Sequence, residues 1–309
     1  MPISSARPLW IPDAIPETHR LNRLRRAGSL LPVFDNETET DISRVWMCAI
    51  AGLIGLPQLR VTVNIPAYRL DVYVGDSLAR TMEVAVGMPR FPTPRGAFAI
   101  TSVEWNPWWI PPDRPWAARE RPMRPGPGNP MGHVKLNFRP LYFLHGTPLE
   151  RSIGTAASHG CIRLANADAI DLARLVHRFG SLTLTPDDIE ALATDTVVTR
   201  TLQLDPTVPL EIRYDLVEIQ AGRLTVYPDI YRLARRSLRE EVYAALAARG
   251  VDTASIDSTR VRAFVRRIAP RGNEIAIDSL MRGGGASIYH SSLPDSGGSV
   301  TTRTGHVAP

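Results

Sequence analysis

Two short pieces of the chain carry the residue types of a nucleophile and its base. The first is Leu144-His145-Gly146-Thr147, and the second is Ala157-Ser158-His159-Gly160-Cys161-Ile162-Arg163-Leu164. A cysteine is a useful nucleophile as the thiolate, and a nearby imidazole can take the proton from the thiol and hold the charge as an ion pair. We expect such a pair to lower the pKa of the thiol below its usual value of about 8.5. These residues therefore predict a cysteine nucleophile that performs acyl transfer.

Two histidines are candidates for the base. His159 lies two residues before Cys161, a spacing that can bring both side chains to one side of a strand or tight turn. His145 ends an apolar strand pattern 16 residues before Cys161. A loop that returns the chain beside that strand would bring His145 against the cysteine.

The residues around Cys161 suit the rest of an acyl-transfer site. Gly160 lets a substrate carbonyl approach the backbone closely, and the N–H groups of Gly160 and Cys161 could face a tetrahedral oxyanion. A helix expected to start near Asn166 would point its positive end toward the same region. Arg163 supplies a fixed charge that could bind a substrate carboxylate or brace the loop.

Other interpretations of the same residues stay open. His133, His145, His159 and Cys161 could be zinc ligands, although their spacing matches no usual zinc pattern. Cys161 could be a buried structural cysteine, but its Ser-His-Gly and Arg neighbours make a poor apolar core. Strand-end histidines satisfied by backbone groups are the alternative reading, above all for His133, and also for His177 and His19.

The second cysteine, Cys48, bears on the nucleophile. If it paired with Cys161 in an oxidising compartment, Cys161 could not react. Its setting in the apolar run from Val45 to Leu56 indicates a small buried hydrophobe instead. That run is about half of the ~20 residues a membrane-spanning helix needs, so we expect a buried helix there and no membrane span.

The elements that must position these residues are mostly strands. Apolar residues alternate over 59–65, 70–74 and 82–86, and similar patterns recur near 98–100, 134–138, 141–144, 197–204, 210–216 and 224–227. Gly75-Asp76 is a plausible hairpin turn. A helix is predicted from Asn166, as its N-cap, to Gly180, and a short one from Thr185-Pro186.

A Pro- and Gly-rich stretch at 106–130 interrupts the strands and contains Trp108, Trp109 and Trp116. Its composition excludes a regular helix or a central strand. Loops of this length often serve binding, so we expect it to cover the substrate, with Trp108, Trp109 and Tyr142 among the substrate-binding residues.

Composition limits the classes of partner. The 309 residues carry a formal charge of +5, with 36 basic and 31 acidic residues and no long run of like charge. No basic stripe with interleaved aromatics is present, so nucleic acid is not an expected partner. A mild positive charge is equally suited to an anionic polymer such as a cell wall.

These motifs resemble those of the L,D-transpeptidase catalytic domain, also called YkuD-like. That family's signature is a histidine followed at a set distance by Ser/Thr-His-Gly-Cys and an Arg or Asn. It is matched by His145-Gly146-Thr147 and Ser158 to Arg163. Three upstream pieces also resemble the family: 63–70, 87–96 and 127–132. The resemblance covers about residues 59 to 185.

The resemblance implies a role for each matching residue. Cys161 would be the nucleophile and His145 the general base, with the Gly146 carbonyl orienting the imidazole ring. The backbone of Gly160, Cys161 and His159 would form the oxyanion hole. Ser158, His159 and Arg163 would shape the catalytic loop and contact the substrate.

The implied substrate is a peptidoglycan stem peptide. Cys161 would attack an L-centre carbonyl, release a D-amino acid and leave a thioester, which an amine of a second stem peptide resolves. No metal or cofactor is expected, acylation by carbapenem-type β-lactams is implied, and the location would be the periplasm or cell envelope. An L,D-carboxypeptidase that uses water, or a non-catalytic wall-binding protein on the same fold, are the alternatives.

The expected fold is mostly β with some α, a β-sandwich-like catalytic domain with helical additions. We divide the chain into an N-terminal arm or small helical layer at 1–56 and a catalytic domain at 57–231. A helical C-terminal extension at 232–282 and a flexible tail at 283–309 would follow.

Overall fold

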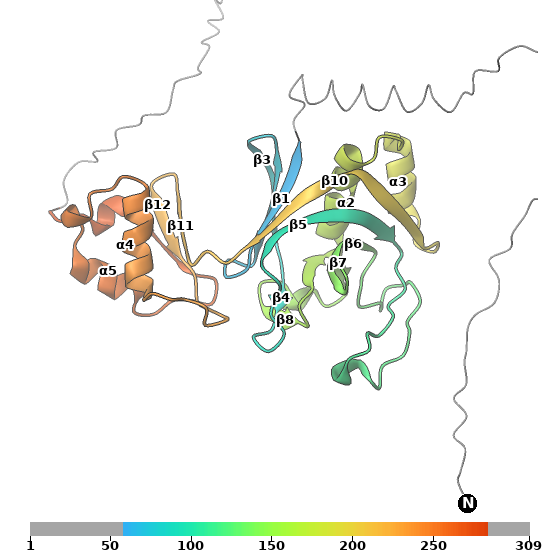
Figure 1. The fold of residues 1–309 in the computed structure, drawn as a ribbon, viewed down its shortest axis with the longest axis horizontal. Coiled ribbons are helices and arrows are strands. Elements are labelled where there is room, and N and C mark those ends of the chain that lie inside the picture. The colour runs from blue at the N-terminus through green and yellow to red at the C-terminus, as the bar shows by residue number, and fades with distance from the viewer. Residues whose placement is uncertain (1–57, 284–309) are drawn as a thin grey trace, which may run out of the picture. The chain divides into compact units, whose positions relative to one another are not determined.

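The computed structural model describes residues 58–283 (Figure 1). The chain divides into two units, Met1–Gly55 and Leu56–Pro309, and all described residues lie in the second. The predicted N-terminal arm, the buried helix that would contain Cys48, His19 and nearly all of the predicted tail therefore fall outside the described residues.

An eight-stranded sheet forms the body of the fold, in the order β3-β2-β1-β10-β5-β6-β7-β9. Its strands are β1 (Leu59–Asn64), β2 (Arg69–Val74), β3 (Ser77–Glu83), β5 (Gly96–Trp105), β6 (Val134–Arg139), β7 (Tyr142–Thr147), β9 (Ile162–Ala165) and β10 (Arg200–Arg213). A small parallel pair, β4 (Val86–Gly87) and β8 (Ala156–Ser158), lies beside it. The prediction of a mostly β fold with some helices is confirmed.

The alternating sequence patterns correspond to real strands. In β1, Leu59, Val61 and Val63 are buried, and the strand lies between β2 and β10 in the sheet. The predicted turn between β2 and β3 is present, and Gly75 adopts a φ of 59°, which glycine reaches without steric cost. The two predicted strands at 197–204 and 210–216 are one strand, β10, with a bulge between Gln203 and Val208.

Helix α2 (Asn166–Gly180) packs against the sheet through β6, β7 and β10. Its apolar stripe includes Leu172, Ala173 and Val176, which are fully buried. Burial of each of the larger side chains, Leu172 and Val176, contributes roughly 1.5–3 kcal/mol to the stability of the fold. Helix α3 (Pro186–Thr194) begins at the predicted position, with Pro186 in its first turn, and the side chains and backbone of Thr185 and Asp188 form a reciprocal cap.

The predicted N-cap of α2 is wrong. Ala165 is the N-cap residue, and Asn166 is the first residue of the helix. The Asn166 side chain instead accepts a hydrogen bond from the His133 N–H (3.2 Å) and donates one to the Thr147 carbonyl (3.2 Å). It therefore links α2 to the strand that carries His145.

The C-terminal part of the described chain has a core of its own. Strands β11 (Val217–Gln220), β12 (Arg223–Val226) and β13 (Asn273–Ala276) form a separate sheet. Helices α4 (Leu238–Ala248) and α5 (Ser258–Val265) cover it through Val242, Leu246 and Val261. Within residues 58–283, short 3-10 helices lie in this part at 253–255 and 277–280, and earlier in the chain at 115–117 and 150–152.

The strand pairing bears on the proposed domain boundary. Residues 217–226, which the sequence places in the catalytic domain, pair with β13 and not with the eight-stranded sheet. The segment 232–282, expected to be helical, also contributes β13. We propose that a C-terminal unit begins near residue 216 and not at residue 232.

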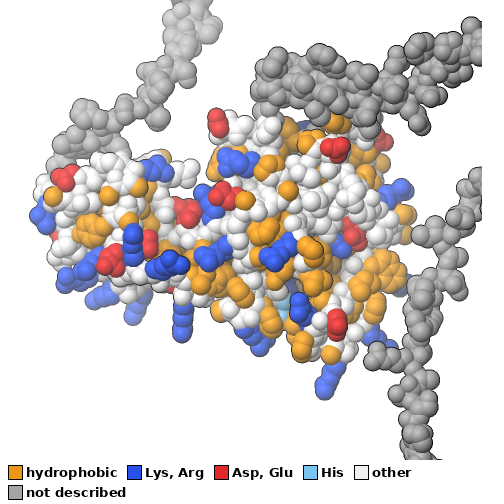
Figure 2. Space-filling model, viewed as in Figure 1, with side chains coloured by type: hydrophobic (Ala, Val, Ile, Leu, Met, Phe, Trp, Pro, Cys, Tyr) orange, Lys and Arg blue, Asp and Glu red, His pale blue; other side chains and the backbone are white. Residues whose placement is uncertain are grey.

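The positive charge of the protein is concentrated in this C-terminal unit. Residues 216–283 contain twelve arginines, no lysine and eight acidic residues. Figure 2 shows basic side chains along the edge of this unit. Among the described residues, no helix is long and apolar enough to cross a bilayer.

Candidate active site

Cys161 lies at the edge of the large sheet, in the link between β8 and β9. Strand β9 runs parallel to β7, with Arg163 opposite His145. Ile162 and Leu164 point into the core, so the alternate residues Cys161 and Arg163 occupy the other face. The strand register therefore brings the predicted nucleophile and the predicted base onto one face at neighbouring positions.

The His145 ring is buried and oriented by the backbone. Its Nδ1 lies 2.7 Å from the Gly146 carbonyl oxygen. Because a carbonyl can only accept, we assign the ring proton to Nδ1, which leaves a lone pair on Nε2. Burial lowers the pKa of His145 to about 4, with the positive charges of Arg163 and Lys135 acting in the same direction. The imidazole is therefore neutral at pH 7.

The Cys161 thiol differs from the sequence expectation of an acidic, ion-paired cysteine. Its S–H points to the Leu141 carbonyl oxygen, 3.6 Å away. Although the residue is partly exposed, desolvation raises the pKa of the thiol to about 11. The Phe143 amide, Arg163 and Lys135 act in the opposite direction but do not outweigh desolvation. The resting pair is a neutral thiol and a neutral imidazole.

Ser158 organises the loop that carries the nucleophile. Its hydroxyl accepts a hydrogen bond from the Gly160 N–H (3.0 Å) and donates one to the Cys161 carbonyl (2.5 Å). The Gly160 N–H therefore bonds Ser158, whereas the sequence suggested that it could face a substrate oxyanion. Ser158 is only 1% exposed, so the side chain that holds this loop is buried.

Gly160 has a backbone conformation that other residues rarely adopt. Its φ is 111°, and a Cβ atom at this position would lie 2.8 Å from the Tyr142 ring. Tyr142 was predicted to contact substrate, and its ring lies directly beside the loop. A glycine before the cysteine is thus required both by the backbone and by this close approach.

A groove with a volume of about 590 Å³ lies next to the loop that carries Cys161. Its walls come from the 88–95 loop, the Pro-rich insert, the β6–β7 turn and the catalytic loop. They are formed by Arg90, Phe91, Pro92, Pro112, Arg114, Pro115, Trp116, Leu141, Tyr142 and His159. Leu141 also accepts the Cys161 thiol hydrogen bond, so the groove and the sulfur meet at this residue.

Aromatic rings close one side of this groove. The Trp116 and His159 rings stack with centroids 3.8 Å apart and planes 12° apart, and Phe91 lies 4.8 Å from His159 on a tilted plane. His159 thus belongs to the wall of the groove, and burial lowers its pKa. Between the two candidate bases we favour His145, because its Nδ1 is held by the Gly146 carbonyl and its Nε2 bonds no group within residues 58–283.

The insert contributes a different tryptophan from the two that were predicted to bind substrate. Trp108 is 48% exposed, and Trp109 forms a bridge with Met123 across the insert. Neither lines the groove, whereas Trp116 does. Trp116 lies in the same insert, and no local sequence pattern distinguishes it from Trp108 and Trp109.

The two other histidines of the described residues, His133 and His177, have structural partners. The His133 ring lies 3.1 Å from the Ala193 carbonyl oxygen, in agreement with the backbone-satisfied interpretation. His177 accepts a hydrogen bond from the Trp105 indole (3.0 Å), and burial lowers its pKa to about 4. Within residues 58–283, no three His, Cys, Asp or Glu side chains are grouped so that they could hold a metal.

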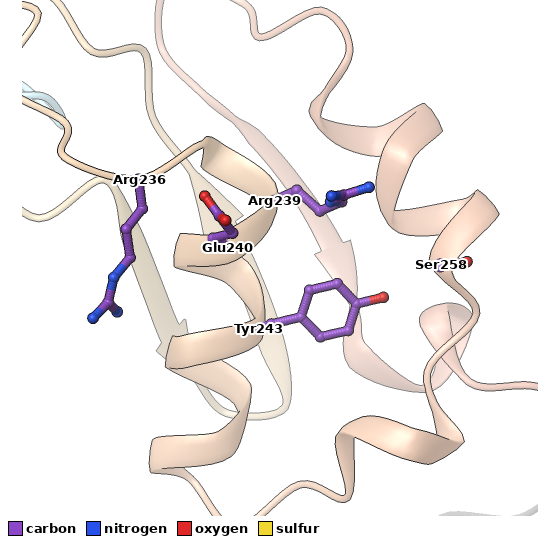
Figure 3. A pocket seen from close by; sticks show the side chains of 5 residues that line it. All are labelled: Arg236, Arg239, Glu240, Tyr243 and Ser258. Carbon is purple, nitrogen blue, oxygen red and sulfur yellow. The ribbon is translucent and has the colours of Figure 1, made fainter.

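A second hollow, of about 420 Å³, lies between α4 and α5 in the C-terminal unit (Figure 3). It is lined by Arg236, Arg239, Glu240, Tyr243 and Ser258, with Arg239 and Tyr243 directed toward Ser258. It contains neither cysteine nor histidine, so we place the candidate chemistry at the groove beside Cys161.

The comparison with protein families agrees with this location. Residues 58–199 match the model of the L,D-transpeptidase catalytic domain. The matched region contains Cys161, His145 and every residue that lines the groove.

Several bacterial proteins are similar in sequence. A Bacillus licheniformis protein named as an L,D-transpeptidase, YkuD, is 33% identical over 128 residues, which are 41% of this chain and 66% of that protein. YqjB of Bacillus subtilis, also named as an L,D-transpeptidase, is 28% identical over 55% of this chain and 94% of its own length. ErfK/SrfK of Salmonella typhimurium is 33% identical, over 35% of this chain and 38% of that protein.

Solved structures of L,D-transpeptidases are also found. LdtMt1 in complex with imipenem has a TM-score of 0.34 and 20% identity, covering 51% of this chain and 59% of that one. L,D-transpeptidase 3 from Mycobacterium tuberculosis with a faropenem-derived adduct has a TM-score of 0.32 and 17% identity, covering 51% and 60%. Residues 58–199 therefore match the L,D-transpeptidase catalytic domain family, and the named relatives are similar to the same region.

Proposed function

We propose that this protein is a peptidoglycan L,D-transpeptidase with Cys161 as its nucleophile. The thiol attacks the carbonyl of an L-centre in a stem peptide, a D-amino acid leaves, and an amine of a second stem peptide resolves the thioester. The observation that carries this proposal is the strand register. It places Cys161 and His145 on one face of the β7–β9 edge, where Leu141, a residue of the groove wall, contacts the sulfur.

The route of the thiol proton follows from the neutral resting states of Cys161 and His145. His145 Nε2 takes the thiol proton as the S–C bond forms, because a pKa of about 4 leaves the resting imidazole without a charge. The resulting imidazolium then returns the proton to the nitrogen of the departing D-amino acid. The Gly146 carbonyl keeps the ring in the required tautomer throughout.

Arg163 and Lys135 act on both partners of this transfer. Each favours a negative sulfur, and each disfavours a positive imidazole. Lys135 is balanced by Glu104, 2.8 Å away, whereas Arg163 lies directly opposite His145. We assign Arg163 the stabilisation of the thiolate character that develops during attack.

The oxyanion is stabilised by the backbone amide of Cys161 in this proposal. The Gly160 amide instead holds Ser158, which fixes the loop that presents the Cys161 amide. Prepositioned donors of this kind stabilise the transition state without reorganisation.

The groove suits an extended peptide with free carboxylates. Arg90 and Arg114 supply positive charge along its walls, and Trp116, His159 and Tyr142 supply flat surfaces. A β-lactam carbonyl presents the same acyl chemistry, so we also propose acylation of Cys161 by carbapenems. Because peptidoglycan lies outside the cytoplasm, the proposed site of action is the periplasm or cell envelope.

Product analysis tests this proposal. The protein is incubated with purified tetrapeptide muropeptides, and the products are separated and weighed by mass spectrometry. Cross-linked dimers that Cys161→Ala does not form are the expected result. Shortened monomers alone would identify an L,D-carboxypeptidase, and no turnover by the wild-type protein would support a wall-binding role on the same fold.

A further inference from the structure

The loop 88–94 follows Gly87, the last residue of β4, and contacts the loop that carries Cys161 at several points. Among the described residues, it pairs with no strand. The Met88 N–H donates to the Ser158 carbonyl (2.9 Å), and the Phe91 ring lies against His159. A side chain on Gly87 would overlap with the Phe91 carbonyl and approach Gly160. The position of this loop therefore determines one wall of the groove and the packing behind Gly160.

One hydroxyl group fastens both ends of this loop. The Tyr231 Oη donates a hydrogen bond to the Gly87 carbonyl (2.6 Å) and accepts one from the Thr93 N–H (3.2 Å). Thr93 in turn accepts a hydrogen bond from the Gly87 N–H through its side chain (2.8 Å). Gly87 and Thr93 are buried, so water cannot easily replace the hydroxyl.

Tyr231 is itself held by residues on both sides of the β11–β12 hairpin. Its N–H donates to the Tyr214 hydroxyl (2.7 Å), and that hydroxyl donates to Asp229 (2.7 Å). The two tyrosine rings stack at 5.5 Å. Tyr214 directly follows β10, and Asp229 and Tyr231 follow β12, so the anchor spans the entry and the exit of the β11–β12 hairpin.

We propose that Tyr231 is a positioning residue that lets the C-terminal unit set the donor-binding wall of the active site. It does not touch the reacting atoms, and it acts through the 88–94 loop on the groove beside Cys161. This inference rests on the proposed function for its catalytic consequence, whereas the anchor itself can be measured without turnover.

Tyr231→Phe tests the anchor, because it removes only the hydroxyl and retains the stacked ring. We expect the kcat/KM for a stem-peptide donor to fall about tenfold, equivalent to ~1.4 kcal/mol, mainly through a higher KM. Alkylation of Cys161 by iodoacetamide, which needs no donor wall, should change less than about twofold. A purely structural defect would change both rates together. Tyr73→Phe, on β2 beneath Arg60, is the matched control and should change neither.

Hydrogen exchange of the backbone amides tests the Tyr231 anchor without any substrate. In the Tyr231→Phe protein, peptides that cover 88–94 should exchange at least about tenfold faster, because the Thr93 amide loses its acceptor. Unchanged exchange there, or equal losses in donor turnover and alkylation, would overturn the inference. If the wild-type protein turned over no donor but the exchange increased in the variant, the proposed function would fail and the anchor would stand.

Discussion

Replacing Gly160 with alanine should disable the catalytic loop while the rest of the fold survives. The residue has a φ of 111°, outside the regions that L-residues with a side chain occupy readily. The new methyl group would also lie 2.8 Å from the Tyr142 ring. Either the backbone stays strained, or the loop rotates and carries Cys161 with it.

The size of each effect can be worked out. A non-glycine residue in a sparsely populated backbone region costs roughly 1–3 kcal/mol. For a protein of this size, each kcal/mol lowers the Tm by roughly 2–4 °C. If the loop relaxes, a displacement of the sulfur by about 1 Å costs on the order of 100-fold in rate. We therefore expect a modest loss of stability and a large loss of reactivity toward donors.

Thermal unfolding and the acylation rate with a carbapenem, followed by intact mass, measure the two effects. Two glycines of the insert are matched controls. A Cβ on Gly128 meets no atom within 4 Å, and Gly126 has the same freedom with a φ of 147°. Gly128→Ala should be neutral, and Gly126→Ala should report backbone strain alone. Wild-type acylation in Gly160→Ala would refute the argument that this glycine positions the nucleophile.

Three further predictions concern ionisation, packing and the groove. Because the pKa of Cys161 is raised to about 11, its alkylation rate should increase with pH and not level off below about pH 9; a plateau near pH 6–7, lost in His145→Ala, would instead reveal an ion pair. Asn166→Ala leaves a backbone N–H and a carbonyl unpaired, so the free energy of unfolding should fall by about 2–4 kcal/mol in urea titrations; no change would show that solvent replaces both bonds. Trp116→Ala should raise the KM for donor roughly 2- to 10-fold by loss of the ring stack, whereas Trp108→Ala, on an exposed side chain, should not; equal effects would contradict the assignment of the groove.

The sequence predicted those parts of the fold that local pattern determines. The alternation in 59–65 and the helix start at Thr185-Pro186 each depend on neighbouring residues, and both are present. Membership of a sheet depends on distant partners. Strand β12 pairs with β13 across helices α4 and α5, so the separate C-terminal sheet left no local signal. Asn166 has the residue type of a cap, but its side chain is used for contacts with His133 and Thr147.

The candidate site, like the fold, was predictable only where local sequence determines it. The types and spacing of His145 and Cys161 predicted a common location, and the β7–β9 register brings them to one face. The protonation of the thiol could not be predicted, because it depends on how far desolvation outweighs Arg163 and Lys135. The choice of Trp116 over Trp108 and Trp109 depends on how an irregular insert folds back, which has no periodicity to follow.

A covalent acyl-enzyme on Cys161 is the central claim, and intact-protein mass spectrometry tests it most directly. The wild-type protein is mixed with a tetrapeptide donor in the absence of acceptor and quenched in acid within seconds. A mass increase equal to the donor minus its terminal D-amino acid, mapped by peptide sequencing to Cys161 and absent in Cys161→Ser, is the predicted result. Turnover of the donor by the Cys161→Ser protein, or an adduct on any other residue, would contradict it.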